Sequence, residues 1–319
     1  LPASALIEAS DSALYGTTFY GGTFGKGTVF RLNKDGSGLT NIYHFSSPPD
    51  WWMPAGVMEG ADGSLYGTSC YGGDFGNGTV FTLNKDGTGF RVLASFPEPP
   101  GTCWGTLTSP LCEGSDGALY GTELGNWGRP TEAETVFKLN KNGADFGVLH
   151  RFQSRPGEGQ YPASTSALVS AGDGALYGVT LAGGASLTNG PGTVFKLNRD
   201  GTGYSIPYRF QTSSGDGSRP VCLIEGRDGV LYGVTEDGGE YRMGTIFRLD
   251  VAPVLYNPVW SGNVFSFQFN ARSNVVYQPQ FKSSLAESNW TALPSLTGQH
   301  GAVTVTETNL NATPRFYRV

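Results

Sequence analysis

Carboxylates beside aromatic and cationic side chains are the groups in this sequence that could do chemistry. The first candidate is Glu123, because it stands where four similar segments of the chain carry Thr or Ser. Glu236 and Asp237 replace aromatic or cysteine residues of those segments, and Asp50 precedes two tryptophans. Glycoside hydrolysis uses two carboxyl groups, one as proton donor and one as nucleophile or base. The types and positions of these four residues indicate such catalysis. The plainer alternative is that they are solvated charges in loops.

The same segments carry the side chains that a sugar site requires. Aromatic faces stack on the C–H faces of sugar rings, and charged groups bond to the hydroxyls. We expect substrate contacts from aromatic residues and arginines, namely Trp51, Trp52, Trp104, Trp127, Tyr161, Arg219 and Arg242. The alternative is that Trp51 and Trp104 only cover a hydrophobic interior.

Histidine and cysteine chemistry is disfavoured. The chain has three histidines, and His44, His150 and His300 all fall outside the expected site, which argues against a Ser-His-Asp triad or a His-rich metal centre. No phosphate-binding or dinucleotide motif lies between a strand and a helix. We expect no metal in catalysis and no cofactor, with room only for a structural cation near the axis of the fold.

The four cysteines suggest one disulfide. Cys103 and Cys112 share a Pro- and Gly-rich loop, and we expect a loop-closing bridge between them, with Cys70 as the rival partner. Cys222 replaces an apolar residue in an expected strand, so we interpret it as a buried free thiol. No cysteine spacing resembles a zinc site.

These residues belong to a unit that the chain repeats five times. Each copy reads close to Asp-x-x-Leu-Tyr-Gly, a Gly-rich gap, Gly-Thr-Val-Phe-x-Leu-Asn, and Asp-Gly or Asn-Gly. The Leu-Tyr-Gly triplets begin at Leu14, Leu65, Leu119, Leu176 and Leu231. A repeat of this period is one supersecondary unit that cannot bury its apolar face alone.

Each unit predicts an antiparallel meander of four short strands, which we name a to d. Alternating apolar runs are joined by Asp-Gly turns, as in a chain of hairpins. Five such meanders fit a β-propeller, whose radial repetition protects sheet edges. We expect blades at about 2–48, 54–98, 105–154, 162–212 and 220–253. The fifth unit loses its last Asp-Gly turn, so the segment 251–256 would have to supply its outer strand, and ring closure is a hypothesis.

The end of the chain has a different pattern. Residues 254–319 lack the Leu-Tyr-Gly phrase and alternate over 263–269, 275–278, 302–306 and 315–319. We expect a small β-sandwich of immunoglobulin or fibronectin type III kind there. The predicted fold class is therefore all-β: a five-bladed β-propeller over 1–253 followed by a β-sandwich over 254–319.

The variable loops of the repeat are expected on one edge of the strands. The a–b and c–d turns are short and repetitive, whereas the b–c and d–a loops differ between units and share the opposite edge. Function in repeat folds collects where the loops vary. Four acidic residues recur at one position of strand a, which favours a structural role: Glu8, Glu59, Glu113 and Glu225.

The repeat resembles a known family. The run Leu-Tyr-Gly-Thr-Thr, followed by Gly21-Gly22 and by Gly-Thr-Val-Phe-Arg-Leu-Asn-Lys-Asp-Gly ending at Gly36, is similar to the GloVer-type tandem repeat of secreted bacterial proteins. The resemblance covers roughly 1–250, and the C-terminal run 315–319 is similar to modules found on such exported proteins. It implies export and a propeller-like fold but no catalytic residues. A chain that starts inside a repeat at Leu1 would fit a removed leader.

Composition narrows the partners. The net charge is −6 and there is no basic cluster, which argues against nucleic-acid binding. No apolar run is long enough to span a bilayer. We expect a secreted or cell-surface monomer that binds a polysaccharide or glycan. Loops that differ between units favour one asymmetric site and a glycosidase, while the alternatives are a lectin or adhesion module and a scaffold without ligand.

Overall fold

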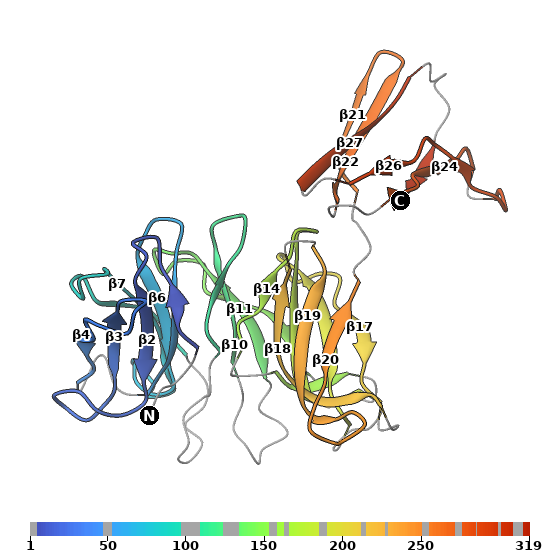
Figure 1. The fold of residues 1–319 in the computed structure, drawn as a ribbon. Coiled ribbons are helices and arrows are strands. Elements are labelled where there is room, and N and C mark those ends of the chain that lie inside the picture. Colours follow the sequence, from blue (N-terminus) through green and yellow to red (C-terminus); the bar gives the residue numbers. More distant parts are fainter. Residues whose placement is uncertain are drawn as a thin grey trace. The chain divides into compact units, whose positions relative to one another are not determined.

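The computed structural model describes residues 5–46, 53–96, 109–123, 134–152, 158–162, 166–184, 190–211, 215–226, 229–250, 255–271, 276–284, 286–298, 301–308 and 315–319. Every helix or strand assigned within these ranges is a strand (Figure 1). The predicted all-β class is thereby confirmed.

The first three repeats form the predicted meanders, because each sheet joins its strands in chain order. The first sheet contains β1 (Ile7–Glu8), β2 (Leu14–Thr18), β3 (Thr28–Leu32) and β4 (Thr40–His44). The second contains β5 (Pro54–Glu59), β6 (Leu65–Ser69), β7 (Thr79–Leu83) and β8 (Arg91–Ser95). The third contains β9 (Cys112–Glu113), β10 (Leu119–Glu123), β11 (Thr135–Leu139) and β12 (Gly147–Arg151). All of their pairings are antiparallel.

The fourth and fifth sheets begin earlier than the expected starts at 162 and 220. In the fourth sheet, β13 (Gly159–Pro162) and β14 (Val169–Ser170) pair with the same strand, β15 (Ala175–Gly183). The sheet continues with β16 (Thr193–Asn198) and β17 (Ser205–Arg209). The fifth sheet contains β18 (Gly217–Glu225), β19 (Leu231–Gly238) and β20 (Ile246–Leu249). The early starts arise because the preceding loop residues are extended and pair with the lengthened b strand.

The Asp of the repeated phrase closes the a–b turn and holds the Tyr. Asp11 accepts a hydrogen bond from the Ala13 N–H at 3.2 Å and another from the Tyr15 hydroxyl at 2.9 Å. The Tyr-to-Asp bond recurs at 2.7 Å in the second and third sheets. Such side-chain-to-backbone bonding favours a turn, and it gives a mostly buried phenol its hydrogen-bond partner.

The Gly of the phrase marks a close backbone approach. A Cβ atom on Gly67 would lie 2.5 Å from the ring of Phe81 and 2.6 Å from the carbonyl oxygen of Gly56. Any side chain there would therefore push strand a and strand c away from strand b.

Each sheet buries one face against the next sheet. Val29 of β3 and Val57 of β5 lie in one buried cluster with Phe81. Phe45 meets the ring of Phe81 edge-on, with centroids 5.3 Å apart. Edge-on Phe pairs recur between the following sheets at 5.1 to 5.2 Å. Successive repeats thus form one continuous core.

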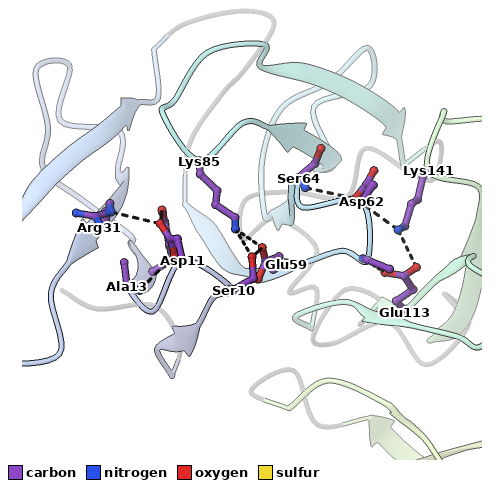
Figure 2. Close-up of polar contacts among 12 residues, drawn as sticks. Ser10, Asp11, Ala13, Arg31, Glu59, Asp62, Ser64, Lys85, Glu113 and Lys141 are labelled. Atoms are coloured by element: carbon purple, nitrogen blue, oxygen red, sulfur yellow. Dashed lines mark hydrogen bonds and ion pairs between the residues drawn. The ribbon is translucent and has the colours of Figure 1, made fainter.

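The recurring Glu of strand a links neighbouring sheets (Figure 2). Glu59 accepts a hydrogen bond from the Ser10 backbone N–H at 2.6 Å and forms an ion pair with Lys85. Glu113 likewise accepts from the Ala61 N–H at 2.8 Å and pairs with Lys141 at 2.7 Å. We name this arrangement of Glu, Lys and the turn of the preceding sheet the inter-sheet clasp. It supports the structural interpretation of these glutamates.

The C-terminal region has a core of its own. Its strands are β21 (Tyr256–Ser261), β22 (Val264–Ala271), β23 (Val276–Tyr277), β24 (Gln280–Lys282), β25 (Thr291–Ala292), β26 (Leu296–Thr297), β27 (Gly301–Glu307) and β28 (Phe316–Arg318). They form three small sheets, and Phe267, Phe269 and Val305 lead the buried cluster. All four strand segments expected here are confirmed, while the immunoglobulin-like order stays a prediction.

The outer strand expected for the fifth repeat at 251–256 is not found at Tyr256. Tyr256 pairs with Gln268 of β22, so it does not extend the fifth sheet, and residues 251–254 lie outside the described ranges. Contacts divide the chain into one unit of 1–170, 176–223 and 233–247 and another of 171–175, 224–232 and 248–319. Closure of five blades into a ring and the boundary at 253 stay predictions.

Candidate functional site

A pair of hydroxyl groups marks the end of strand b in four of the repeats. Thr18 and Thr28 lie 3.0 Å apart through their Oγ1 atoms, and the N–H of Thr28 also donates to Thr18. The equivalent hydroxyl pairs measure 2.8 to 3.0 Å in the second, fourth and fifth sheets. This pair ties strand b to strand c beside the loop that joins them.

Glu123 takes the place of one hydroxyl in the third sheet. It ends β10, pairs in register with Thr135 of β11, and accepts a hydrogen bond from the Thr135 hydroxyl at 3.3 Å. Thr135 pairs in turn with Arg151 of β12. Directly opposed residues point to the same face of a sheet, so the carboxyl, hydroxyl and guanidinium groups form a row across three strands.

The environment of Glu123 raises its proton affinity. Burial raises the pKa of the Glu123 carboxyl to about 7, although the Thr135 hydroxyl and the charge of Arg151 act in the opposite direction. A carboxyl group with a pKa near neutrality can hold a proton and donate it, which is the property tuned in general acids. Glu123 is therefore the sequence-predicted site residue whose surroundings best suit acid catalysis.

Three further predicted site residues come together in the fifth sheet. Arg219 of β18 lies 3.0 Å from Glu236 and 3.6 Å from Asp237, both on β19. All three side chains are exposed, so the ion pairs add little stability. Arg219 has a φ of 56°, a left-handed conformation uncommon for a side chain of this size. Its backbone N–H donates to the Pro191 carbonyl at 2.7 Å, which fixes it beside the fourth sheet.

The remaining predicted residues are less informative. Arg242 is exposed in the turn between β19 and β20, where its N–H donates to the Gly239 carbonyl at 3.2 Å. Tyr161 lies on β13, and only its backbone is described. Several residues fall outside the described ranges: Asp50, Trp51, Trp52, Trp104, Trp127 and Cys103.

The expected disulfide of Cys112 is not formed. Cys112 is a free thiol on β9, where it pairs in register with Tyr120 and packs against the core between the third and fourth sheets. Burial raises the pKa of this thiol to about 12, so it is unreactive. The prediction was wrong because Cys112 belongs to strand a rather than to the loop before it. Cys222 is also a free thiol, half-buried rather than fully buried as expected, and Cys70 is buried.

Two histidines reach the loops more closely than the sequence indicated. His44 and His150 lie on d strands, but Nδ1 of His44 accepts the N–H of Thr23 in a b–c loop at 3.0 Å. His150 lies 3.1 Å from Glu158, which precedes β13. Burial lowers the pKa of His150 although Glu158 favours its charged form. The sequence signal that could have indicated these contacts was the position of both histidines near the ends of the d strands.

Exposed aromatic residues at the b–c loop tips were also missed. Phe24, Phe75 and Tyr241 occupy the same place after a Gly-Gly pair, and all three are exposed. The glycines turn the chain with positive φ, as Gly22 at 75° and Gly73 at 72° do. The repeated sequence Gly-Gly-x-aromatic could have identified them.

Two negative observations apply to the described residues alone. Within them, no three His, Cys, Asp or Glu side chains gather as a metal site would require. Nor does that part of the chain hold a helix long and apolar enough to cross a membrane.

The chain belongs to the Gloeobacter/Verrucomicrobia repeat family. The family profile matches residues 2–168 and again residues 108–317, so it covers nearly the whole chain and confirms the resemblance seen in the repeat. No curated protein matches the sequence.

Three solved structures resemble the chain distantly. A gluconolactonase from Xanthomonas campestris is 13% identical over 85% of this chain and 96% of its own, with a TM-score of 0.42. The GH74 enzyme of Niastella koreensis is 11% identical over 82% of this chain but only 40% of its own, with a TM-score of 0.48. An oligogalacturonate lyase in complex with manganese is 13% identical over 77% and 64%, with a TM-score of 0.45. Likenesses of this size decide neither the fold nor the activity of this chain.

Proposed function

We propose that this protein is a secreted, carbohydrate-active protein that cleaves a polysaccharide, with Glu123 as the proton donor. The observation that carries the proposal is the raised pKa of Glu123, at about 7, at a position where four other repeats need only a hydroxyl. A structural role would be served by Thr or Ser. Burial destabilises the charged form of this carboxyl group, so the group suits proton donation to a leaving group.

The second carboxylate of a glycosidase would come from Asp50, Glu236 or Asp237. Of these, Glu236 and Asp237 form exposed ion pairs with Arg219, an arrangement that can also bind sugar hydroxyls through charge-assisted hydrogen bonds. The tryptophans expected to stack on the sugar remain part of the proposal. So do export, which the family resemblance supports, and a glycan partner.

The experiment is a glycan-degradation screen with wild type and Glu123→Gln. We expect product release by wild type and a loss of about 100-fold or more in the variant, with binding retained, because amide cannot donate the proton. Glu287→Gln is the matched control, since Glu287 is an exposed carboxylate of the C-terminal region. Product release by Glu123→Gln at the wild-type rate would remove Glu123 from the mechanism.

The repeated loop tips favour a second candidate function, carbohydrate binding without cleavage. Phe24, Phe75 and Tyr241 offer exposed rings at equivalent positions, as a lectin with several similar sites would. Calorimetry with the glycans of the screen separates the two functions. More than one equivalent sugar per chain, weakened by Phe75→Ala and unaffected by Glu123→Gln, would establish a lectin.

A further inference from the structure

The inter-sheet clasp changes its composition between the third and fourth sheets. The strand-a glutamate of the second and third repeats is replaced by Ser170 in the fourth, and the lysine of the clasp is replaced by Arg199. The fourth repeat therefore keeps the cation of the clasp and loses its acidic partner.

The Arg199 guanidinium bridges the two sheets through hydroxyl groups. Its Nη1 donates to the Ser115 hydroxyl and its Nη2 donates to the Ser170 hydroxyl at 3.0 Å. Ser115 belongs to the a–b turn of the third sheet and Ser170 to β14 of the fourth. Arg199 thus joins the same two elements that a glutamate and a lysine join in the other clasps, but both of its partners are neutral.

The charge of Arg199 is not compensated within the part of the chain that the structure describes. No carboxylate there forms an ion pair with it, because Asp116 pairs with Lys138 at 2.9 Å, whereas the equivalent Asp62 pairs with the clasp lysine Lys141 at 3.5 Å. The side chain of Arg199 is half-buried, and its Nε is buried without a hydrogen-bond partner. A partly buried charge without a counter-ion is costly, so an anion beside it would be stabilising.

Hydrogen-bond donors converge on the same place. In the clasps a turn N–H donates to the glutamate, and the N–H of Gly172 likewise donates to both carboxylate oxygens of Glu225, at 2.9 and 3.1 Å. The equivalent donor of the third sheet is the N–H of Ser115, and the residue opposite it is Ser170. Among the described residues this N–H has no acceptor, and neither serine hydroxyl has an acceptor for its own proton.

We propose that Arg199, Ser115 and Ser170 form a binding site for a small carboxylate, which we name the Arg199 site. The ligand would accept hydrogen bonds from the Ser115 N–H and from the two hydroxyls, and it would lie beside the guanidinium as a glutamate lies beside lysine in the other clasps. Charge-assisted hydrogen bonds to a planar guanidinium suit a carboxylate. One positive charge in place of a pair of opposite charges matches a ligand with a single negative charge.

The Arg199 site is separate from the proposed catalytic position. Ser115 lies in the turn that precedes β10, whereas Glu123 ends β10 at the opposite edge of the sheet. Carboxylate binding could therefore hold whether or not the protein cleaves a polysaccharide.

The test is the thermal midpoint of wild type in sodium formate, with sodium chloride at the same ionic strength as the reference. Formate is the smallest carboxylate, and a ligand of its size binds at best with a dissociation constant of about 1 mM. At a tenfold excess over that constant, binding should raise the midpoint by about 3–5 °C relative to chloride. Equal ionic strength removes charge screening as a cause of the difference.

Three variants assign the response to the Arg199 site. Ser170→Glu supplies the carboxylate from the chain itself, so it should raise the midpoint in chloride by about 2–4 °C and abolish the response to formate. Arg199→Gln should also abolish the response, because it removes the positive charge, and it tests the site even if Ser170→Glu does not fold. Ser283→Glu adds the same charge at an exposed serine of the C-terminal region and should respond to formate as wild type does.

Glucuronate and glucose distinguish the sources of such a carboxylate. A dissociation constant for glucuronate at least about tenfold below that of formate, with no response to glucose, would identify an acidic sugar as the ligand, and equal constants would identify the carboxylate alone. Equal midpoints of wild type in formate and chloride would overturn the proposal. So would a formate response that persists in Arg199→Gln or in Ser170→Glu.

Discussion

Glu123 places a carboxyl group where the other repeats have a hydroxyl. The free energy that the folded protein loses when this carboxyl group ionises can be measured. Its pKa is raised from 4.5 to about 7, so the folded state keeps a proton that the unfolded state loses between these values. The free energy of unfolding should then fall as pH rises from about 4.5 to about 7, by about 1–3 kcal/mol, and level off above.

Glu123→Gln should remove this pH dependence, because the amide does not titrate. Urea denaturation at several pH values would compare it with wild type, and Glu287→Gln should follow the wild-type curve. Parallel curves for wild type and Glu123→Gln would show that Glu123 has an ordinary pKa. For an enzyme that donates the Glu123 proton, the rate should fall about tenfold per pH unit above pH about 7.

Cys112 gives a second test at the residue scale. The residue is half-buried and packs against an apolar cluster, and burial of its thiol raises the pKa, so it should resist thiol reagents in the native protein and react only after unfolding. Cys112→Ser should cost about 1–3 kcal/mol, because a hydroxyl would enter that cluster. The thermal midpoint of wild type should not change with reductant. A midpoint that fell under reducing conditions would instead restore a disulfide.

The inter-sheet clasp is the feature to test at the scale of elements. Burial alone would raise the pKa of Glu59, but hydrogen bonds from Lys85 and Ser10 outweigh it and lower the pKa. Stability from the charged form is therefore present above the ordinary pKa of 4.5 and is lost as pH falls through the lower folded value. Glu59→Gln should cost about 1–2 kcal/mol at neutral pH and less in acid.

Glu8→Gln is the matched control for the clasp, because Glu8 forms an ion pair with Lys34 in which both side chains are exposed, at 57% and 51%. An exposed ion pair contributes little, so the substitution should change the free energy of unfolding by less than about 0.5 kcal/mol. Equal costs for Glu8→Gln and Glu59→Gln, measured by urea denaturation, would contradict the clasp.

Strands were the most predictable elements, and the reason is local. In 64–69 and 78–84, alternation and the Asp-Gly turn are written in adjacent residues, and β6 and β7 fall inside these ranges. The early start of the fourth sheet was not predictable in this way. Gly159–Pro162 becomes β13 only because it pairs with β15, whose residues lie further along the chain.

At the scale of the whole molecule, separate cores predict separate unfolding. The cluster around Phe269 belongs to the C-terminal unit and the cluster around Phe81 to the other. Calorimetry should resolve two transitions, with Phe269→Ala lowering one and Phe81→Ala the other, each by the equivalent of about 3–5 kcal/mol. A single transition lowered by both substitutions would show one cooperative unit.

The sequence by itself determined the repeat, its a-to-d strand order and the structural use of Glu59 and Glu113, because these follow from patterns within one unit or from their recurrence. Only the tertiary structure decided the proton affinity of Glu123 and the packing of Cys112 against the core. Each of these depends on which distant segments surround a side chain. Burial and electrostatic environment are properties of that assembled neighbourhood, and no local pattern specifies them.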